Sequence, residues 1–480
     1  MKKIHFFLLF LILISAFLVR LYRFDSPIAD WHSWRQSDTS SVSRNFVQNG
    51  FDVLHPKFDD LSNVPSGLDN PNGYRFVEFP IYNLVQAGLS SLSDSLTLEQ
   101  WGRIVTIFSQ LLSIVFLYLL VKKYAGNTAA IFAAFFFAFL PYNIYFGRTI
   151  LPDPTMVAAS LGGIYFFDKW TENNSKFKIQ NYLLFFLSIV FTSSALLLKP
   201  YALFFTLPII YLSFKSFNLK FLFKWQLWLF VVLTLAPLLL WRYWMQQFPE
   251  GIPQSNWLFN EGNIRFKGSF FHWIFGDRIG RLILGYFGLP LLFFGLIRKR
   301  EAKEGLFFIS FLFSSLLYLI VMARGNVQHD YYQILIIPSI AIFLGLGCEF
   351  VFKAANFFNK WTSYTILLIC ILFSFMFGWF FVRDFFNINN PSIISAGKAV
   401  DNLTEKDAKI IANYNGDTSF LYQTKRKGWA SFEKPLPEMI KIGASYLVLV
   451  NPKKEDYGLQ KEYKIMSSTS DYILFDLKNR

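Results

Sequence analysis

Residues 6–19 read FFLLFLILISAFLV, and residues 29–46 read ADWHSWRQSDTSSVSRNF. The first stretch is a continuous apolar run that follows the basic residues Lys2 and Lys3. It has the basic start of a secretory signal but no small-x-small cleavage site, so we interpret residues 4–20 as a retained first membrane span. The second stretch places acids, arginines and a histidine directly after that span. The chain therefore combines a membrane anchor with chemistry-bearing residues beside it.

The composition of the whole chain supports a membrane protein. Of its 480 residues, 54% are hydrophobic, 20% are aromatic and 16% are charged, whereas soluble domains carry about 25% charged residues. The net charge of +14 comes from basic residues scattered between apolar runs rather than clustered on one soluble unit. This distribution favours an orientation signal over nucleic-acid binding.

Apolar runs long enough to cross a bilayer recur along the sequence. Because a helix needs about 20 apolar residues to cross, the runs predict about eleven transmembrane helices. Their predicted positions are 4–20, 101–121, 127–146, 154–170, 181–198, 200–214, 225–245, 281–297, 305–323, 332–351 and 362–382.

The loops between these helices alternate in charge. Loops on the side of the N-terminus carry lysine and arginine, for example Lys122 and Lys123, and the opposite short loops are nearly free of them. By the positive-inside rule, the opposite loops face away from the cytoplasm. We therefore predict a multi-pass membrane protein whose functional side faces away from the cytoplasm.

The fold class that follows is an all-α polytopic membrane bundle with a small extracytoplasmic α/β domain. We predict a transmembrane domain over residues 1–385, which includes a first outer loop at 21–100 and a second at 246–280. The C-terminal α/β domain is predicted at 386–480, because strand-like runs alternate there with helix-compatible stretches. These runs are AKIIANY (408–414), SYLVLV (445–450) and DYILFDL (471–477).

Polar residues of unusual type gather on the predicted outer face. Ionisable residues near membrane depth are costly to bury and usually mark function. Three predicted outer turns retain one basic residue each, against the positive-inside rule: Arg148, Lys199 and Arg324. The other candidates on this face are Asp30, His32, Arg35, Asp38, Arg75, Glu78, Asp153, His329, Asp330, Tyr331 and Tyr332.

Each motif also has a structural interpretation. Asp153 in LPDP has the position of a helix cap, and Asp38 in RQSDTSS has that of a solvated acid in the first turn of a surface helix. HDYY is typical of an interfacial aromatic belt. Asp30 and His32 resemble half of a metal site, but no second matched pair follows. The sequence therefore calls for no cofactor, and nothing in it supports a divalent metal.

A carboxylate and several cations at the outer surface suit transfer from a phosphate-activated lipid. The lipid tail stays in the bilayer, so its phosphate lies at headgroup level. Arginine and lysine there stabilise the phosphate as a leaving group, while a carboxylate acts as the base for the acceptor. This chemistry requires the outer loops to meet in one pocket.

These motifs resemble the GT-C glycosyltransferases. The resemblance is carried by HSWRQSDT (32–39), EFPIY (78–82), GRTILPDP (147–154) and HDYYQILIIP (329–338). In particular, the chain is similar to bacterial relatives of the protein O-mannosyltransferases and of the lipid A aminoarabinose transferase. The resemblance implies an inverting transferase that uses a polyprenyl-phosphate sugar and membrane lipid, with Asp38 as the base.

The resemblance also implies roles for the remaining residues. The residues expected to contact the donor phosphate are Arg148, Lys199, Arg324 and His329. The residues expected to bind the substrates are Arg35, Glu78, Asp153, Tyr331 and Tyr332. The acceptor is a protein, lipid or glycan, and the sequence does not identify the sugar. Two alternatives remain, a transporter of lipid-linked sugars and a ligase that uses a polyprenyl-diphosphate donor.

Overall fold

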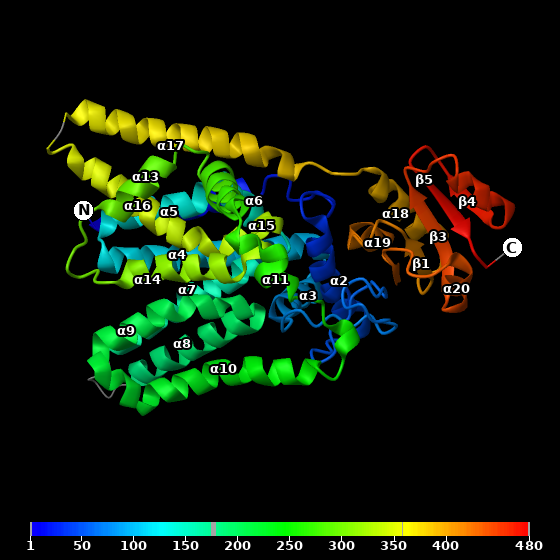
Figure 1. The fold of residues 1–480 in the computed structure, drawn as a ribbon, viewed down its shortest axis with the longest axis horizontal. Helices are drawn as coiled ribbons and strands as arrows, with labels where there is room; N and C mark the ends of the chain where they lie inside the picture. Colours follow the sequence, from blue (N-terminus) through cyan, green and yellow to red (C-terminus); the bar gives the residue numbers. More distant parts are fainter. Residues whose placement is uncertain (1, 174–178, 358, 479–480) are drawn as a thin grey trace. The chain divides into compact units, whose positions relative to one another are not determined.

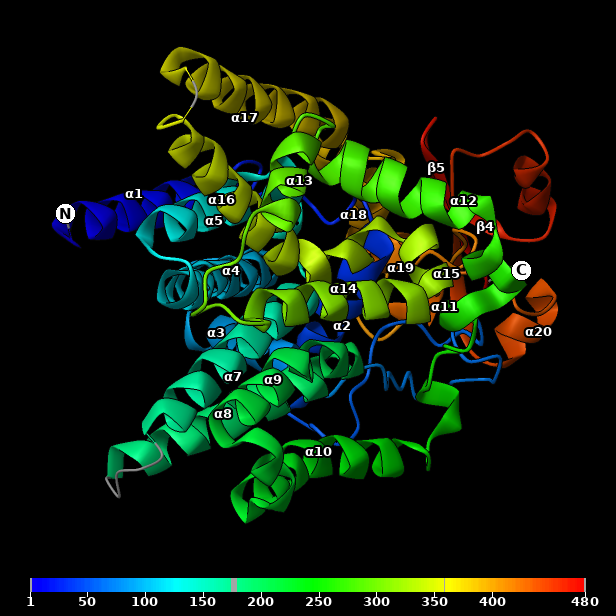
Figure 2. The ribbon, with the colours of Figure 1, turned by 60° about the vertical axis from the view of Figure 1, so that its left-hand side comes forward.

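The computed structural model describes residues 2–173, 179–357 and 359–478, and it is mostly helical with one small sheet (Figures 1 and 2). The chain divides into two compact units. The helical unit comprises residues 1–22, 104–240 and 255–384, and the sheet-containing unit comprises residues 23–103, 241–254 and 385–480.

The helices follow the apolar runs of the sequence closely. The main ones are α1 (Lys2–Arg20), α4 (Leu98–Tyr124), α5 (Asn127–Phe139), α6 (Pro141–Phe146), α7 (Asp153–Asn173), α8 (Ile179–Leu198), α9 (Leu207–Phe217), α10 (Trp225–Met245), α13 (Leu289–Ile297), α14 (Phe307–Val321), α16 (Ile337–Ala354) and α17 (Lys360–Val382). Pro200 ends α8 and starts the 3₁₀ helix η1 (Pro200–Thr206), as expected for a residue that lacks an N–H and favours a first helical turn.

Six helical segments in the described part of the chain are long and apolar enough to cross a membrane. They are Leu98–Tyr124, Ile179–Leu198, Pro200–Phe223, Trp225–Met245, Asp330–Ala354 and Lys360–Phe386. Shorter apolar helices cover Ile4–Arg20, Asn127–Phe139 and Phe307–Val321. The count of eleven spans therefore stays a prediction.

Small residues allow close packing in the helical unit. A Cβ atom added at Gly345 of α16 would lie 2.6 Å from the carbonyl oxygen of Ala129 and 2.6 Å from the backbone nitrogen of Ala133, both in α5. The α16 helix also packs against α13. Glycine thus allows helix backbones to approach where a larger residue would separate them.

The sheet-containing unit holds a five-stranded sheet of order β2-β1-β3-β5-β4. Its strands are β1 (Lys409–Ala412), β2 (Lys427–Trp429), β3 (Ala444–Val450), β4 (Lys464–Ser468) and β5 (Tyr472–Asp476). The β1 strand pairs in parallel with β2 and β3, and β5 pairs antiparallel with β3 and β4. All three predicted strand runs form strands.

Alternating side chains of this sheet build two hydrophobic cores. Ile410 and Val448 pack with residues of α18 (Ser392–Leu403) and α19 (Thr418–Thr424) on one face. Ile411 and Leu447 pack on the other face with Met439 of α20 (Leu436–Lys441). This alternation is the period of two expected for strands buried on both faces.

The first outer loop belongs to the same compact unit as this sheet. Leu61 donates its backbone N–H to Gly428 at 2.7 Å, and Gly428 donates to Asp59 at 3.0 Å. Leu61 also joins the core beside Trp429. Backbone pairing at the edge strand β2 groups this loop with the sheet by compactness. The division into a transmembrane domain over residues 1–385 and a C-terminal domain over 386–480 stays a prediction.

Candidate functional site

The helix α2 (Ser33–Asn49) of the sheet-containing unit is polar in sequence and buried in structure. Asp38 is 3% exposed, and its neighbours Ser37, Thr39 and Ser40 are also buried. The interpretation of Asp38 as a solvated acid on a surface helix is therefore wrong. A polar helix is stable inside a protein only where its side chains find hydrogen-bond partners.

Both carboxylate oxygens of Asp38 are engaged. Arg75 Nη2 lies 2.5 Å from Oδ2, and the Thr418 hydroxyl donates to Oδ1 at 2.7 Å. Arg75 comes from the first outer loop and Thr418 from α19, so three distant segments meet at this carboxylate. These two contacts fix the orientation of Asp38.

A second buried ion pair lies in the same pocket. Arg35 Nη2 is 2.6 Å from Glu78 Oε1, and both side chains are buried. Asn83, from α3 (Ile81–Leu92), donates to the Thr39 carbonyl at 2.6 Å. The pocket has a volume of about 10 Å³, which is the space of about one water molecule. It is lined by Arg35, Asp38, Thr39, Val42, Pro56, Arg75, Val77, Glu78, Pro80 and Asn83.

Two further carboxyl groups titrate near Asp38. Burial raises the pKa of Asp60 to about 6, and the negative charge of Asp38 acts in the same direction, against hydrogen bonds from Ser62. Burial also raises the pKa of Asp417, with a further contribution from Asp38. The base candidate therefore lies in a region where additional negative charge is disfavoured.

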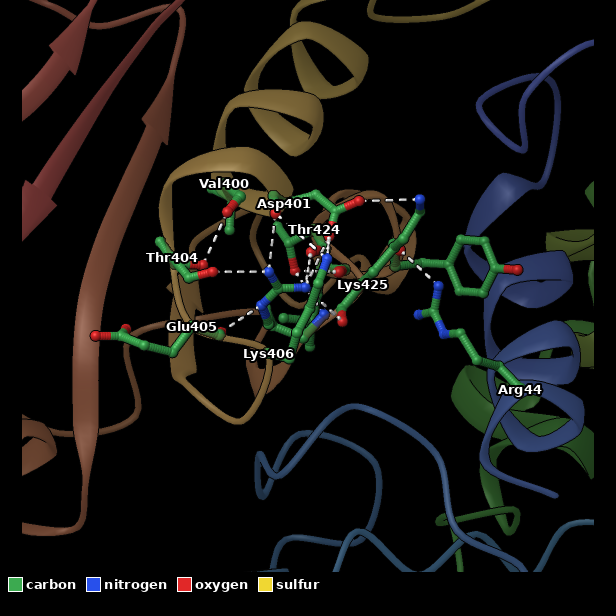
Figure 3. A network of polar contacts seen from close by, with 11 residues as sticks. Arg44, Val400, Asp401, Thr404, Glu405, Lys406, Thr424 and Lys425 are labelled. Carbon is green, nitrogen blue, oxygen red and sulfur yellow. Dashed lines mark hydrogen bonds and ion pairs between the residues drawn. The ribbon is translucent and has the colours of Figure 1, made fainter. Parts of the chain in front are cut away.

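A separate polar network holds the C-terminal segment together (Figure 3). Arg426 Nη1 lies 2.9 Å from Asp401 Oδ1, while Lys425 and Lys406 also contact this carboxylate. Despite partial burial, hydrogen bonds from these three cations lower the pKa of Asp401 below its usual value. Arg426 also donates to the carbonyls of Thr404 and Glu405. The network joins α18 to the segment after α19.

In the helical unit, Lys199 and Asp153 form an ion pair. Lys199 Nζ lies 3.6 Å from Asp153 Oδ2, and the two side chains are buried. Lys199 is the single residue between α8 and η1, and Asp153 is the first residue of α7. The α7 helix contacts both η1 and the 3₁₀ helix η6 (Asp330–Ile336). Asp153 thus has more than the capping role that its sequence context allowed.

Arg148 is 1% exposed, and its guanidinium lies 5.5 Å from the ring centroid of Tyr145. Burial of an arginine is costly unless aromatic rings, carbonyls or acids surround it. Arg148 is therefore a confined cation, unlike the exposed lysines at the ends of the apolar helices.

His329, Tyr331 and Tyr332 form an aromatic group around the start of η6. The ring centroids of Tyr331 and Tyr332 are 4.7 Å apart, and that of His329 is 5.7 Å from Tyr331. Both tyrosines are buried, so the interpretation of HDYY as an interfacial aromatic belt is wrong.

Arg324 differs from the other candidate cations. It lies on the short helix α15 (Ala323–Gln328), its side chain is 37% exposed, and its Nε is 3.9 Å from Glu261 Oε2. This loose pair places Arg324 among residues of the second outer loop.

The candidates thus fall into two sets within the two compact units. Asp38, Arg35 and Glu78 share the pocket of the sheet-containing unit with Arg75. In the helical unit, Asp153 and Lys199 pair, and α7 contacts the element that carries Tyr331 and Tyr332. That the two sets serve one reaction stays a prediction.

Sequence reasoning noted Arg75 but gave it no role, and it missed Thr418 and Asp60. RFVEFP (75–80) contained a signal for Arg75, because it sets an arginine three residues before Glu78 among apolar side chains. NGDTSF (415–420) reads as an ordinary helix start, since Asp417 caps α19 by accepting the Ser419 N–H. Only the packing of α19 on α2 reveals Thr418.

Asp30, which with His32 resembled half of a metal site in the sequence, has a protein hydrogen-bond partner. Asp30 accepts a hydrogen bond from Gln36 at 2.8 Å and is fully buried. Within residues 2–173, 179–357 and 359–478, no three His, Cys, Asp or Glu side chains are grouped as a metal ion would need.

Comparisons with known proteins point to one fold. Residues 78–244 match the family described as dolichyl-phosphate-mannose-protein mannosyltransferase. No curated protein sequence matches the chain. Among solved structures, the chain is similar to ArnT from Cupriavidus metallidurans bound to undecaprenyl phosphate, at 13% identity, a TM-score of 0.66 and 97% coverage of each chain.

Two further structures share this architecture. Archaeal oligosaccharyltransferase AglB from Archaeoglobus fulgidus, in complex with an inhibitory peptide and a dolichol-phosphate, is 11% identical, with a TM-score of 0.59; the match covers 92% of this chain and 69% of that one. Mycobacterial arabinofuranosyltransferase AftD is 12% identical, with a TM-score of 0.52, and the coverages are 92% and 36%. The predicted resemblance to the GT-C superfamily is confirmed at the level of fold, and the apolar helices agree with a multi-pass membrane protein.

Proposed function

We propose that this chain, which has the fold of the GT-C glycosyltransferases, transfers a sugar from a polyprenyl-phosphate donor to an acceptor at the extracytoplasmic face of the bacterial inner membrane. The observation that carries the proposal is the buried carboxylate of Asp38, oriented by Arg75 and Thr418 at the edge of a polar pocket. A carboxylate held in one orientation at a pocket is suited to act as a general base.

In the proposed reaction, Asp38 accepts the proton of the acceptor nucleophile. The nucleophile attacks the anomeric carbon from the side opposite phosphate, so the new glycosidic bond forms as the carbon–oxygen bond to phosphate breaks. One displacement inverts the anomeric configuration. A positioned general base contributes about 10²–10⁴-fold to such a reaction.

The leaving polyprenyl phosphate needs positive charge. We assign this role to Lys199, Arg148, Arg324 and His329. The 3.6 Å separation of Lys199 and Asp153 is longer than a charge-assisted hydrogen bond of about 2.7–2.9 Å.

The remaining candidates bind or shape the substrates. Arg35 and Glu78 lie beside Asp38 in the pocket and present charged groups to hydroxyls. Asp153, Tyr331 and Tyr332 belong to elements that contact one another, and the aromatic rings offer faces on which a sugar ring can pack. We further propose that eleven spans place the α/β segment outside the membrane.

The test is sugar transfer by the purified full-length protein in lipid vesicles. A panel of undecaprenyl-phosphate-linked sugars, radiolabelled in the sugar, is supplied with a cell-envelope extract as acceptor. We expect one donor to yield labelled, acceptor-linked product and free undecaprenyl phosphate. Absence of acceptor-linked label with every donor would overturn the proposal.

The same assay separates the alternatives. A transporter of lipid-linked sugars would move label across the vesicle membrane without forming a glycosidic bond. A ligase would act on the corresponding diphosphate donors and release undecaprenyl diphosphate. Transporters keep ionisable groups near the membrane midplane and are built from repeated halves, and no repeat is evident in this sequence.

A further inference from the structure

The C-terminal segment contributes a side chain to the proposed base. Thr418 is the first residue of α19, and its hydroxyl donates to Asp38 Oδ1 at 2.7 Å across a sequence separation of 380 residues. This contact lies wholly within the sheet-containing unit.

The Thr418 oxygen has a second acceptor within reach. It lies 3.2 Å from the carbonyl oxygen of Trp34. A threonine hydroxyl has one proton and two lone pairs, so it can donate to only one of these oxygens at full strength while accepting from another donor. The shorter contact and the negative charge of the carboxylate favour Asp38 as the partner when Asp38 is ionised.

The position of Thr418 is fixed by contacts between α19 and α2. The Ser40 and Tyr422 hydroxyls lie 2.9 Å apart, and Arg44 donates to the Tyr422 carbonyl at 3.1 Å. The Arg44 guanidinium also lies 4.0 Å from the Tyr422 ring centroid, and Figure 3 shows Arg44 on its helix directed towards this segment. Thr418 is thus held on a rigid support, as a group that orients a base must be.

We propose that Thr418 is a positioning residue that hydrogen-bonds Asp38 in both of its protonation states. While Asp38 is a carboxylate, Thr418 donates to Oδ1. When Asp38 has taken the acceptor's proton on Oδ1, that O–H donates to Thr418, which turns its own proton to the Trp34 carbonyl. No bond to Thr418 is made or broken, and the only proton transferred passes from the acceptor to Asp38. This inference rests on the proposed function.

The arrangement gives the C-terminal segment a defined role. Without the Thr418 hydroxyl, protonated Asp38 would keep the contact between Arg75 and Oδ2. Its new O–H on Oδ1 would lose the oxygen that accepts its hydrogen bond. The charged groups facing Asp38 are Arg35 of its own helix, Arg75, Glu78 and Asp60 of the first outer loop, and Asp417, the N-cap of α19. All of them stay unchanged when only the Thr418 hydroxyl is removed.

The experiment compares Thr418→Val, which removes the hydroxyl at constant shape, with Thr418→Ser, which keeps it. Thr424→Val is the matched control, because Thr424 is on the same helix and fully buried, and its hydroxyl donates to the Leu421 carbonyl and accepts the Arg426 N–H rather than contacting Asp38. Transfer from the undecaprenyl-phosphate sugar that the wild type uses is measured across pH. If Thr418→Val gives no folded protein, Thr418→Ala replaces it.

We expect kcat of Thr418→Val to fall about tenfold, as for loss of a hydrogen bond to a charged group. The fall should appear across the pH range, because Thr418 hydrogen-bonds Asp38 both as the carboxylate and as the acid. Thr418→Ser should keep the wild-type rate within about twofold and the wild-type profile, since it retains the donor.

The outcomes separate the two proposals. If Asp38→Asn abolishes transfer but Thr418→Val matches Thr424→Val in rate and pH profile, the role of Thr418 is wrong and the proposed function stands. If Thr418→Ser is as impaired as Thr418→Val, the threonine acts through packing and the inference is also overturned. If the wild type uses no donor of the panel, the proposed function fails, and the role of Thr418 with it.

Discussion

The two acids assigned to the reaction, Asp38 and Asp153, are both buried but are held differently. Asp38 has Arg75 at 2.5 Å and Thr418 at 2.7 Å, one on each oxygen. Asp153 lies 3.6 Å from Lys199. A base needs a precise direction, which short hydrogen bonds supply. A phosphate site needs positive charge, and in the proposed reaction the buried Lys199 supplies it beside Asp153.

The largest expected effect tests the tightly held acid. Asp38→Asn keeps the shape of the side chain and removes its basicity, so transfer should fall by about 10²–10⁴-fold while the protein stays folded in membranes. Turnover of labelled donor is the measurement. Asp52→Asn, on the exposed surface of the same unit, is the matched control and should be unaffected. Near-normal turnover of Asp38→Asn would remove Asp38 as the base.

The next effect tests the looser pair. Lys199→Ala should raise KM for the lipid donor about tenfold, because one charge-assisted contact to phosphate is lost, with a smaller effect on kcat. Donor titration measures both constants. Lys220→Ala, at an exposed lysine outside the proposed site, serves as the control. An unchanged donor KM would show that Lys199 serves only to neutralise Asp153.

Arg324 should have a smaller effect, because its side chain is 37% exposed and its contact with Glu261 is 3.9 Å long. Arg324→Gln should raise the donor KM about two- to threefold at low salt, and high salt should reduce the difference by screening. A loss as large as that of Lys199→Ala would mean that Arg324 moves into the phosphate site on binding.

The smallest effect concerns the charge around Asp38. Because burial raises the pKa of Asp60 to about 6, the folded state holds its proton more tightly than the unfolded state. Asp60 therefore lowers the stability of the fold as pH rises from about 4 to about 6. Asp60→Asn removes this titration.

The melting temperature of Asp60→Asn should accordingly improve relative to wild type across that pH range and level off above it. In the Asp38→Asn background the gain should shrink, since the Asp38 charge contributes to the shift. A constant difference between Asp60→Asn and wild type at all pH values would contradict this account.

Sequence patterns predicted the helices and strands that consist of a continuous apolar run. The apolar runs predicted the helices, and short strand-like runs predicted β1, β3 and β5. The strands β2 and β4 were missed, because β2 is three residues long and β4 is an edge strand with no buried residue. Sequence patterns detect a buried strand through a run of apolar residues, and these two strands lack such a run.

The site was predicted in its residue types more than in its contacts. Asp38, Arg35 and Glu78 come from the predicted first outer loop and line one pocket. Lys199 and Asp153 come from two separate predicted outer turns and form an ion pair. The interpretation of the polar helix α2 as exposed was wrong. Its hydrophilic side chains are buried because other polar groups form hydrogen bonds with them.

Hydropathy and residue type were enough to predict an apolar helical protein with an α/β segment and to single out its unusual acids and cations. The pairing of Leu61 with β2, and the orientation of Asp38 by Arg75 and Thr418, became visible only in the folded chain. Hydropathy and periodicity record how each segment is buried. Contacts between residues hundreds of positions apart depend on which buried surfaces fit one another.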